Sequence, residues 1–121
     1  MEKIIEFKNY SDIRGNLTTI DDVLPFEIKR VYYIFGEVGQ KRGFHKHKKT
    51  RQVAVCINGS CKIVFSKNGI ETKYILDNPN KGLLIEPDDF HWIEDFSINS
   101  ILLVLASENY DSNDYIYENN D

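Results

Sequence analysis

Two Asn-Gly dipeptides, each set between two runs of β-forming residues, constrain this fold more than any other feature. They are Asn58-Gly59 and Asn68-Gly69, and the flanking runs are residues 52–57, 60–65 and 70–76. Asn-Gly accepts the positive φ angles of a type I′ turn, so each dipeptide predicts an antiparallel hairpin.

The predicted turn at Asn58-Gly59 also fixes which side chains are neighbours. It places Cys56 opposite Cys61, and alternation along the strands gathers one set of side chains on a shared face. That face would hold Gln52, Ala54, Cys56, Cys61, Ile63 and Phe65. Two cysteines are too few for a disulfide framework, so we expect two buried, reduced thiols.

Further short runs of β-forming residues are separated by Gly, Pro, Asn and Asp. They cover residues 3–7, 16–20, 28–35, 82–86, 90–95 and 100–106. Many short strands with turn residues between them predict an all-β domain of the sandwich, jelly-roll or barrel type. The length fits a single domain over residues 1–121, and we expect the end of its polar tail, residues 116–121, to be mobile.

Composition and charge narrow the classes of partner. Hydrophobic residues make up 41% of the chain, which is enough for a core. The formal net charge is -4, and basic residues gather only between Lys41 and Arg51, which suits a small anionic ligand better than a nucleic acid. No run approaches the roughly 20 apolar residues of a membrane span, and the N-terminus does not resemble a signal peptide. We therefore expect a cytoplasmic protein that binds neither nucleic acid nor membrane.

The stretch Gly43-Phe44-His45-Lys46-His47 is the most informative for function. The two histidines are two residues apart, so on a strand both imidazole rings point to the same face. Two such rings can bind a metal ion, or they can transfer protons near neutral pH.

The spacing around these histidines resembles the first motif of cupin barrels, with Gln52 in place of the usual glutamate. The second motif survives in part at residues 87–91 and is one residue short, so we expect His91 to face the other way. A divalent cation needs carboxylates or several imidazoles in a fixed geometry. We therefore predict a small cupin or jelly-roll barrel without a metal, in which His45 and His47 are free for acid-base work.

Longer stretches, taken in order, resemble one family over nearly the whole chain. They are residues 11–17, 25–35, 42–49, 52–53, 58–61, 82–87, 91–92, 103–107, 110–111 and 114–116. The chain is similar to the dTDP-4-keto-6-deoxyglucose 3,4-ketoisomerases of bacterial sugar-nucleotide pathways. The same group of sugar cupins includes WxcM-like proteins with other roles.

The resemblance implies an isomerase without a metal or other cofactor, which moves the keto group of dTDP-4-keto-6-deoxyglucose from C4 to C3. Its product would enter dTDP-3-amino-3,6-dideoxyhexose biosynthesis. The resemblance also implies a homodimer, in which residues 1–10 could supply a strand to the partner's sheet. The configuration at C4 of the product and the downstream glycan stay open. A non-catalytic dTDP-sugar-binding cupin and a metal-dependent cupin enzyme are the alternatives.

Moving a carbonyl by one carbon passes through an enediol, so a base must remove the C3 proton and a proton must return to C4. Imidazole has a suitable pKa. The resemblance assigns the base to His45, with His47 as a second acid-base group. Tyr32 shares a strand face with Arg30, and we expect it to relay protons between the two oxygens. The adjacent Tyr33 is expected to pack in the core.

The diphosphate of such a substrate needs cations. Arg42, directly before the histidines, is the first choice because a guanidinium can bind two phosphate oxygens. The further candidates are Arg14, Arg30 and Lys49. Gln52 could hydrogen-bond a sugar hydroxyl or orient His47, and the sequence singles out no residue to stack on the thymine.

Overall fold

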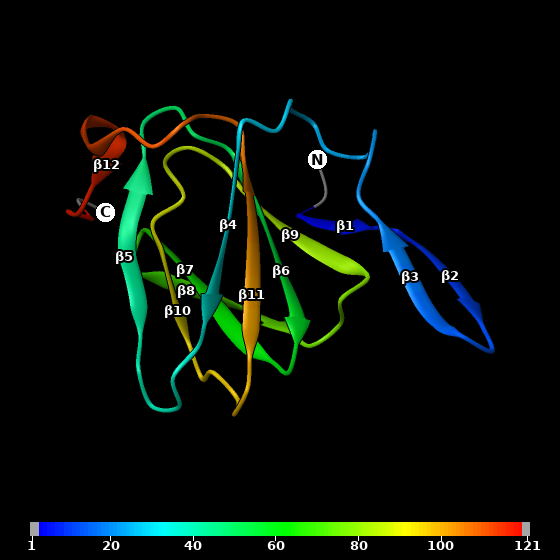
Figure 1. The fold of residues 1–121 in the computed structure, drawn as a ribbon. Coiled ribbons are helices and arrows are strands. Elements are labelled where there is room, and N and C mark those ends of the chain that lie inside the picture. Colours follow the sequence, from blue (N-terminus) through cyan, green and yellow to red (C-terminus); the bar gives the residue numbers. More distant parts are fainter. Residues whose placement is uncertain (1–2, 120–121) are drawn as a thin grey trace.

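The computed structural model describes residues 3–119 and contains two five-stranded antiparallel sheets that pack face to face (Figure 1). Sheet one has the order β1 (Ile4–Glu6), β9 (Lys81–Ile85), β6 (Gln52–Asn58), β11 (Ile101–Ala106) and β4 (Arg30–Phe35). Sheet two has the order β12 (Tyr115–Ile116), β5 (Arg42–His47), β10 (His91–Glu94), β7 (Cys61–Lys67) and β8 (Ile70–Leu76). A separate hairpin pairs β2 (Lys8–Asp12) with β3 (Gly15–Thr19), and the 3-10 turn η1 (Ser112–Asp114) precedes β12.

The prediction of an all-β jelly roll is confirmed. The two sheets remain separate ladders among the described residues, so the molecule is a sandwich and not a closed barrel. The six further strand runs agree with observed strands to within two residues, whereas β2 and β12 were not predicted. No helix in the described part of the chain is long and apolar enough to cross a membrane.

The two ends of the chain carry predictions that stay predictions. In this structure β1 pairs with β9 of its own sheet, and β12 pairs with β5. The exchange proposed for residues 1–10 and the mobility proposed for 116–121 include residues 1–2 and 120–121, which lie outside the described residues.

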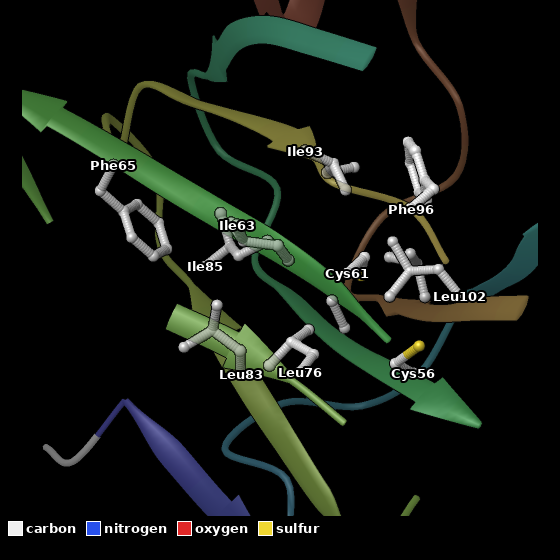
Figure 2. Packing of buried hydrophobic residues seen from close by; sticks show 12 residues of the cluster. Cys56, Cys61, Ile63, Phe65, Leu76, Leu83, Ile85, Ile93, Phe96 and Leu102 are labelled. Atoms are coloured by element: carbon white, nitrogen blue, oxygen red, sulfur yellow. The ribbon is translucent and has the colours of Figure 1, made fainter. Parts of the chain in front are cut away.

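The main core lies between the two sheets and is built from the inward-facing side chains of both (Figure 2). A second apolar cluster on the opposite face of sheet one contains Phe7, Val53, Val55 and Leu84. Gly82 lies at this contact, because a Cβ atom there would come within 2.6 Å of Val53 Cγ1 and 2.7 Å of Phe7 Cζ.

The predicted hairpin at Asn68-Gly69 is confirmed. Lys67 pairs with Ile70 across the turn, and Asn68 and Gly69 have φ angles of 52° and 76°. Both central residues thus adopt the left-handed conformation that a type I′ turn requires.

The predicted hairpin at Asn58-Gly59 is wrong, because β6 lies in sheet one and β7 in sheet two. Gly59 has a positive φ but Asn58 does not. The residues of the expected turn form hydrogen bonds to the loop that contains Ser97 and Asn99. Asn58 Nδ2 donates to the Asn99 carbonyl at 2.7 Å, and the Ser60 N–H donates to Ser97 Oγ at 2.8 Å. The chain therefore crosses from one layer to the other.

This crossing preserves the predicted set of inward-facing residues while changing how they meet. Cys56 and Cys61 are not ladder partners but belong to the same core cluster between the sheets, and Figure 2 shows them in it. Both are free and buried, as predicted. The Cys61 thiol is hydrogen-bonded to the Cys56 thiol. This hydrogen bond, together with burial, raises the pKa of Cys61, so its thiol stays protonated and unreactive.

Candidate functional site

A cavity of about 350 Å³ opens between the two sheets beside the histidine strand. Its apolar lining is continuous with the main core and includes Ala54, Ile63, Ile85, Ile93, Leu102 and Val104. Its polar lining comes from separate strands and comprises Arg30, Tyr32, Arg42, His45, Gln52 and His91, while Tyr115 and Tyr117 of the C-terminal tail add an aromatic wall. The cavity is near the small end of ligand sites, which suits a group the size of one sugar ring.

His45 lines this cavity from β5, as predicted. Burial, followed by the neighbouring His91 and His47, lowers the pKa of His45 to about 4, although a backbone hydrogen bond to Gly43 opposes the shift. The ring is therefore neutral at pH 7 and available to accept a proton.

A β-bulge shapes the histidine strand. His91 pairs with His45 and Trp92 with Gly43, so Phe44 has no partner on β10. Phe44 has a φ of 57° and Gly43 a φ of 105°. A Cβ atom on Gly43 would lie 3.2 Å from the His91 carbonyl oxygen, so glycine allows β10 to approach closely here.

His91 faces the cavity, and the expectation that it turns away is wrong. Its ring centroid lies 5.0 Å from that of His45, and His91 shares the inward face of β10 with Ile93, two residues further on. The preceding turn absorbs the missing motif residue, with Asp88 at a φ of 69°. His91 Nδ1 lies 2.9 Å from the Asp89 carbonyl oxygen, and burial lowers the pKa of His91 to about 4.

His47 lies behind His45 rather than on the cavity wall. The two ring centroids are 5.1 Å apart, and the His47 side chain is only 3% exposed. Its Nδ1 lies 3.0 Å from Asp114 Oδ2, while its Nε2 is buried and has no hydrogen-bond partner among the described residues.

No role was predicted for Tyr115 and Tyr117, which line the cavity, or for Asp114. Asp114 was placed in a polar tail, yet it is buried. Its carboxylate accepts hydrogen bonds from the Thr50 hydroxyl and, at 2.8 Å, from the Lys49 N–H. Burial alone would raise the pKa of Asp114, but the hydrogen bonds from Thr50, Lys49 and His47 outweigh it and hold that pKa below its usual value. The carboxylate is therefore ionised at neutral pH.

Tyr32 and Gln52 meet on the opposite side of the cavity. Gln52 Nε2 donates to the Tyr32 hydroxyl oxygen at 2.9 Å, so the amide orients Tyr32 and not His47. Burial and the nearby Tyr115 raise the pKa of Tyr32, which keeps its hydroxyl protonated. Arg30 lies over the Tyr32 ring, 4.5 Å from its centroid, as their shared strand face predicts. Tyr33 is 63% exposed on the outer face of β4, so the expectation of core packing is wrong.

The candidate phosphate ligands divide into two groups. Arg42 and Arg30 line the cavity, and Arg42 makes no ion pair within residues 3–119. Arg14 lies at the tip of the β2–β3 hairpin, which projects away from the sandwich (Figure 1), and it pairs with Asp12 at 2.5 Å. Lys49 is exposed and contributes its backbone N–H to Asp114.

No group of three histidine, cysteine, aspartate or glutamate side chains within residues 3–119 is arranged to hold a metal ion. Two of the three clustered imidazoles already use Nδ1, His47 toward Asp114 and His91 toward the Asp89 carbonyl. Gln52 presents its amide nitrogen to Tyr32 at the position where a cupin metal site usually has a carboxylate.

Comparison with known proteins gives one consistent group of relatives. The family model described as FdtA: WxcM-like, C-terminal matches residues 1–121. A curated relative from Aneurinibacillus thermoaerophilus, TDP-4-oxo-6-deoxy-alpha-D-glucose-3,4-oxoisomerase, is 47% identical over 122 residues, which cover 97% of this chain and 88% of the relative.

Solved structures of similar proteins share the fold closely. The QdtA 3,4-ketoisomerase from Thermoanaerobacterium thermosaccharolyticum, a double mutant in complex with TDP, superposes with a TM-score of 0.92 at 46% identity, covering 95% of this chain and 86% of that one. A histidine-to-asparagine mutant of the same enzyme, in complex with TDP-4-keto-6-deoxyglucose, gives a TM-score of 0.92 at 43% identity, with the same coverage.

Proposed function

The chain belongs to the WxcM-like, C-terminal family, and from this premise we propose that it is a sugar-nucleotide 3,4-ketoisomerase acting on dTDP-4-keto-6-deoxyglucose. The observation that carries this proposal is the convergence of His45, Tyr32 and Arg42 on one cavity. These groups supply a neutral base, a protonated hydroxyl and a free cation. The relatives at 43% to 47% identity bear names that state this activity or this ligand.

In the proposed reaction His45 removes the C3 proton of the keto sugar. The ring is neutral at pH 7 because its pKa is lowered to about 4, so no prior deprotonation is needed. The resulting enediolate carries negative charge on oxygen, and a hydrogen-bond donor is needed there. Return of a proton to C4 and loss of the O3 proton complete the isomerisation without net oxidation.

Tyr32 is the proposed donor and relay at the sugar oxygens. Because Gln52 donates to the Tyr32 oxygen, the hydroxyl hydrogen of Tyr32 remains available for O3 or O4. Its raised pKa keeps that hydrogen in place between proton transfers. His47 is the proposed second acid-base group, acting from behind His45.

Arg42 is the proposed diphosphate ligand, with Arg30 beside it. A guanidinium binds two phosphate oxygens at once, and Arg42 has no ion pair among the described residues to compete with a phosphate. Lys49 could add long-range charge only. Arg14 does not line the cavity of its own chain, so we propose that in the homodimer it could serve only the partner's cavity. We further propose that the enzyme is cytoplasmic and needs no metal.

Deuterium wash-in tests this function. The purified protein, incubated in D2O with dTDP-4-keto-6-deoxyglucose, should introduce deuterium at C3 and C4, and the exchange should persist after treatment with a chelator. A 3-aminotransferase added to the mixture should trap the 3-keto product, and its aminosugar identifies the C4 configuration. Binding of dTDP without exchange would leave only a sugar-nucleotide-binding protein, and loss of exchange with the chelator would indicate a metal-dependent enzyme.

A further inference from the structure

The buried carboxylate of Asp114 connects the C-terminal tail to the histidine strand. Three donors reach it from one turn of chain: His47 Nδ1 at 3.0 Å, the Lys49 N–H at 2.8 Å and the Thr50 hydroxyl. Its own backbone carbonyl accepts from the Lys48 N–H at 2.9 Å. Four contacts to residues 47–50 leave Asp114 one position in the fold.

The charge on this carboxylate decides where the His47 proton lies. Asp114 is ionised, so it can only accept hydrogen bonds, and Nδ1 of His47 must therefore carry the hydrogen. In the Nδ1-protonated tautomer, Nε2 carries a lone pair and no hydrogen. Because Nε2 is buried without a partner in the described structure, the opposite tautomer would bury an unpaired N–H donor, which is costly.

The same contacts fix the tail against the cavity. Tyr115 follows Asp114 directly and pairs with His47 across β12 and β5. Its ring centroid lies 4.5 Å from that of His47 and 5.1 Å from that of His45. Releasing Asp114 would therefore disturb both the wall of the cavity and the ring behind the base.

We propose that Asp114 is a positioning residue that holds His47 in the Nδ1-protonated form and fastens β12 against β5 beside His45. The effect on turnover rests on the proposed isomerase function, whereas the effect on the His47 ring does not. Asp114 touches no reacting atom in this role and acts only through His47 and Tyr115.

Asp114→Asn tests the proposal because it removes the charge with almost no change in shape. The Lys49 N–H requires an oxygen at the Oδ1 position, so the new amide nitrogen takes the Oδ2 position and points its hydrogens at His47 Nδ1. His47 Nδ1 must then accept a hydrogen bond from the amide, and the proton of the imidazole ring moves to Nε2. Asp111→Asn is the matched control, because Asp111 is exposed in the same turn and bonds to Asn113 and not to His47.

The readouts are the nitrogen-15 shifts of His47, the rate of deuterium wash-in and the affinity for dTDP. We expect Asp114→Asn to exchange the shifts of the two ring nitrogens, to lower kcat by at least about tenfold and to change dTDP affinity less than twofold. Thr50→Val, which removes a contact to Asp114 but keeps the carboxylate, should retain the wild-type tautomer.

Two outcomes would overturn the proposal: an unchanged tautomer in Asp114→Asn, or an equal loss of turnover in Asp111→Asn. If wild-type protein shows no deuterium exchange at all, the isomerase function fails. The nitrogen-15 shifts still decide in that case whether Asp114 sets the His47 tautomer.

Discussion

Gln52 Nε2 donates a hydrogen bond of 2.9 Å to the hydroxyl oxygen of Tyr32, which joins β6 to β4 across the intervening β11 and forms one polar pair on the sheet-one wall. Cupin metal sites usually have a glutamate at the position of Gln52. Here an amide occupies that position. Because its N–H donates to the Tyr32 oxygen, the hydroxyl hydrogen of Tyr32 is not used in this contact. In the proposed mechanism, this pair prepares the Tyr32 hydroxyl to donate to the sugar.

Replacing Gln52 should reduce turnover more than binding. Gln52→Leu removes one neutral hydrogen bond from Tyr32, so we expect kcat for deuterium wash-in to fall about 3- to 10-fold with little change in KM. Gln52→Glu should be worse, because a carboxylate accepts the Tyr32 hydrogen and withholds it from the sugar. Higher activity in Gln52→Glu than in Gln52→Leu would disprove this role.

His45→Asn should abolish the chemistry while preserving the site. Asparagine lacks a basic nitrogen, and we expect wash-in at C3 to fall by at least about 100-fold. Affinity for dTDP, measured by calorimetry, should stay within twofold because His45 is proposed to contact the sugar and not the nucleotide. An equal loss of exchange and binding would mean that His45 is a binding residue.

The pH profile should carry the signature of the lowered His45 pKa. Only the neutral ring accepts a proton, so lowering its pKa to about 4 keeps the base active through the range where an ordinary histidine, with a pKa of about 6.5, becomes charged. We expect kcat/KM to be level between about pH 5 and 7 and to fall as the pH drops through the value for His45. If kcat/KM instead falls with an apparent pKa near 6.5 while circular dichroism shows an intact fold, the lowered pKa of His45 is contradicted.

Arg42 and Arg14 offer a matched pair of arginine substitutions. Arg42→Ala removes a charged donor from the cavity, and we expect dTDP affinity to fall about tenfold or more. Arg14→Ala should leave the affinity of a monomeric preparation unchanged, because Arg14 is not among the residues that line the cavity of its own chain. Weaker binding by Arg14→Ala in a dimeric preparation alone would place this hairpin at the partner's cavity. Unchanged binding by Arg42→Ala would exclude it as the diphosphate ligand.

Gly82→Ala should destabilise the sandwich. The new methyl group would collide with Val53 and Phe7, and overpacking of this kind lowers the free energy of unfolding by about 1–3 kcal/mol. Lys81→Ala, at the exposed neighbouring position, should change it by less than about 0.5 kcal/mol. Urea unfolding measures both, and equal effects would show that the second apolar cluster tolerates the added volume.

Short sequence patterns predicted correctly those structural features that depend only on neighbouring residues. The turn at Asn68-Gly69 is confirmed because its two φ angles depend on those two residues alone. The turn at Asn58-Gly59 failed because contacts with Ser97 and Asn99, some forty residues away, decide whether the chain returns or crosses. The period of two still identified the inward-facing residues correctly, since alternation does not depend on which strand is the partner.

The site followed the same rule. His45 was predicted from the family motif, Tyr32 from the strand face that it shares with Arg30, and Arg42 from its position directly before the histidines. All three line the cavity. His91 was misjudged because a turn at Asp88 compensates for the missing motif residue. Asp114 was missed because its partner His47 lies 67 positions earlier in the chain, and nothing in a polar tail indicates that one of its carboxylates will be buried.

The β12 wall has a consequence for how the protein is made. A ribosome releases all the strands of sheet one, and all of sheet two except β12, before it releases Asp114 and Tyr115. The segment that completes the cavity wall is thus made after the other strands of both sheets. A chain that has been made only as far as the end of β11 therefore lacks Tyr115 and Tyr117, and with them the aromatic wall of the cavity.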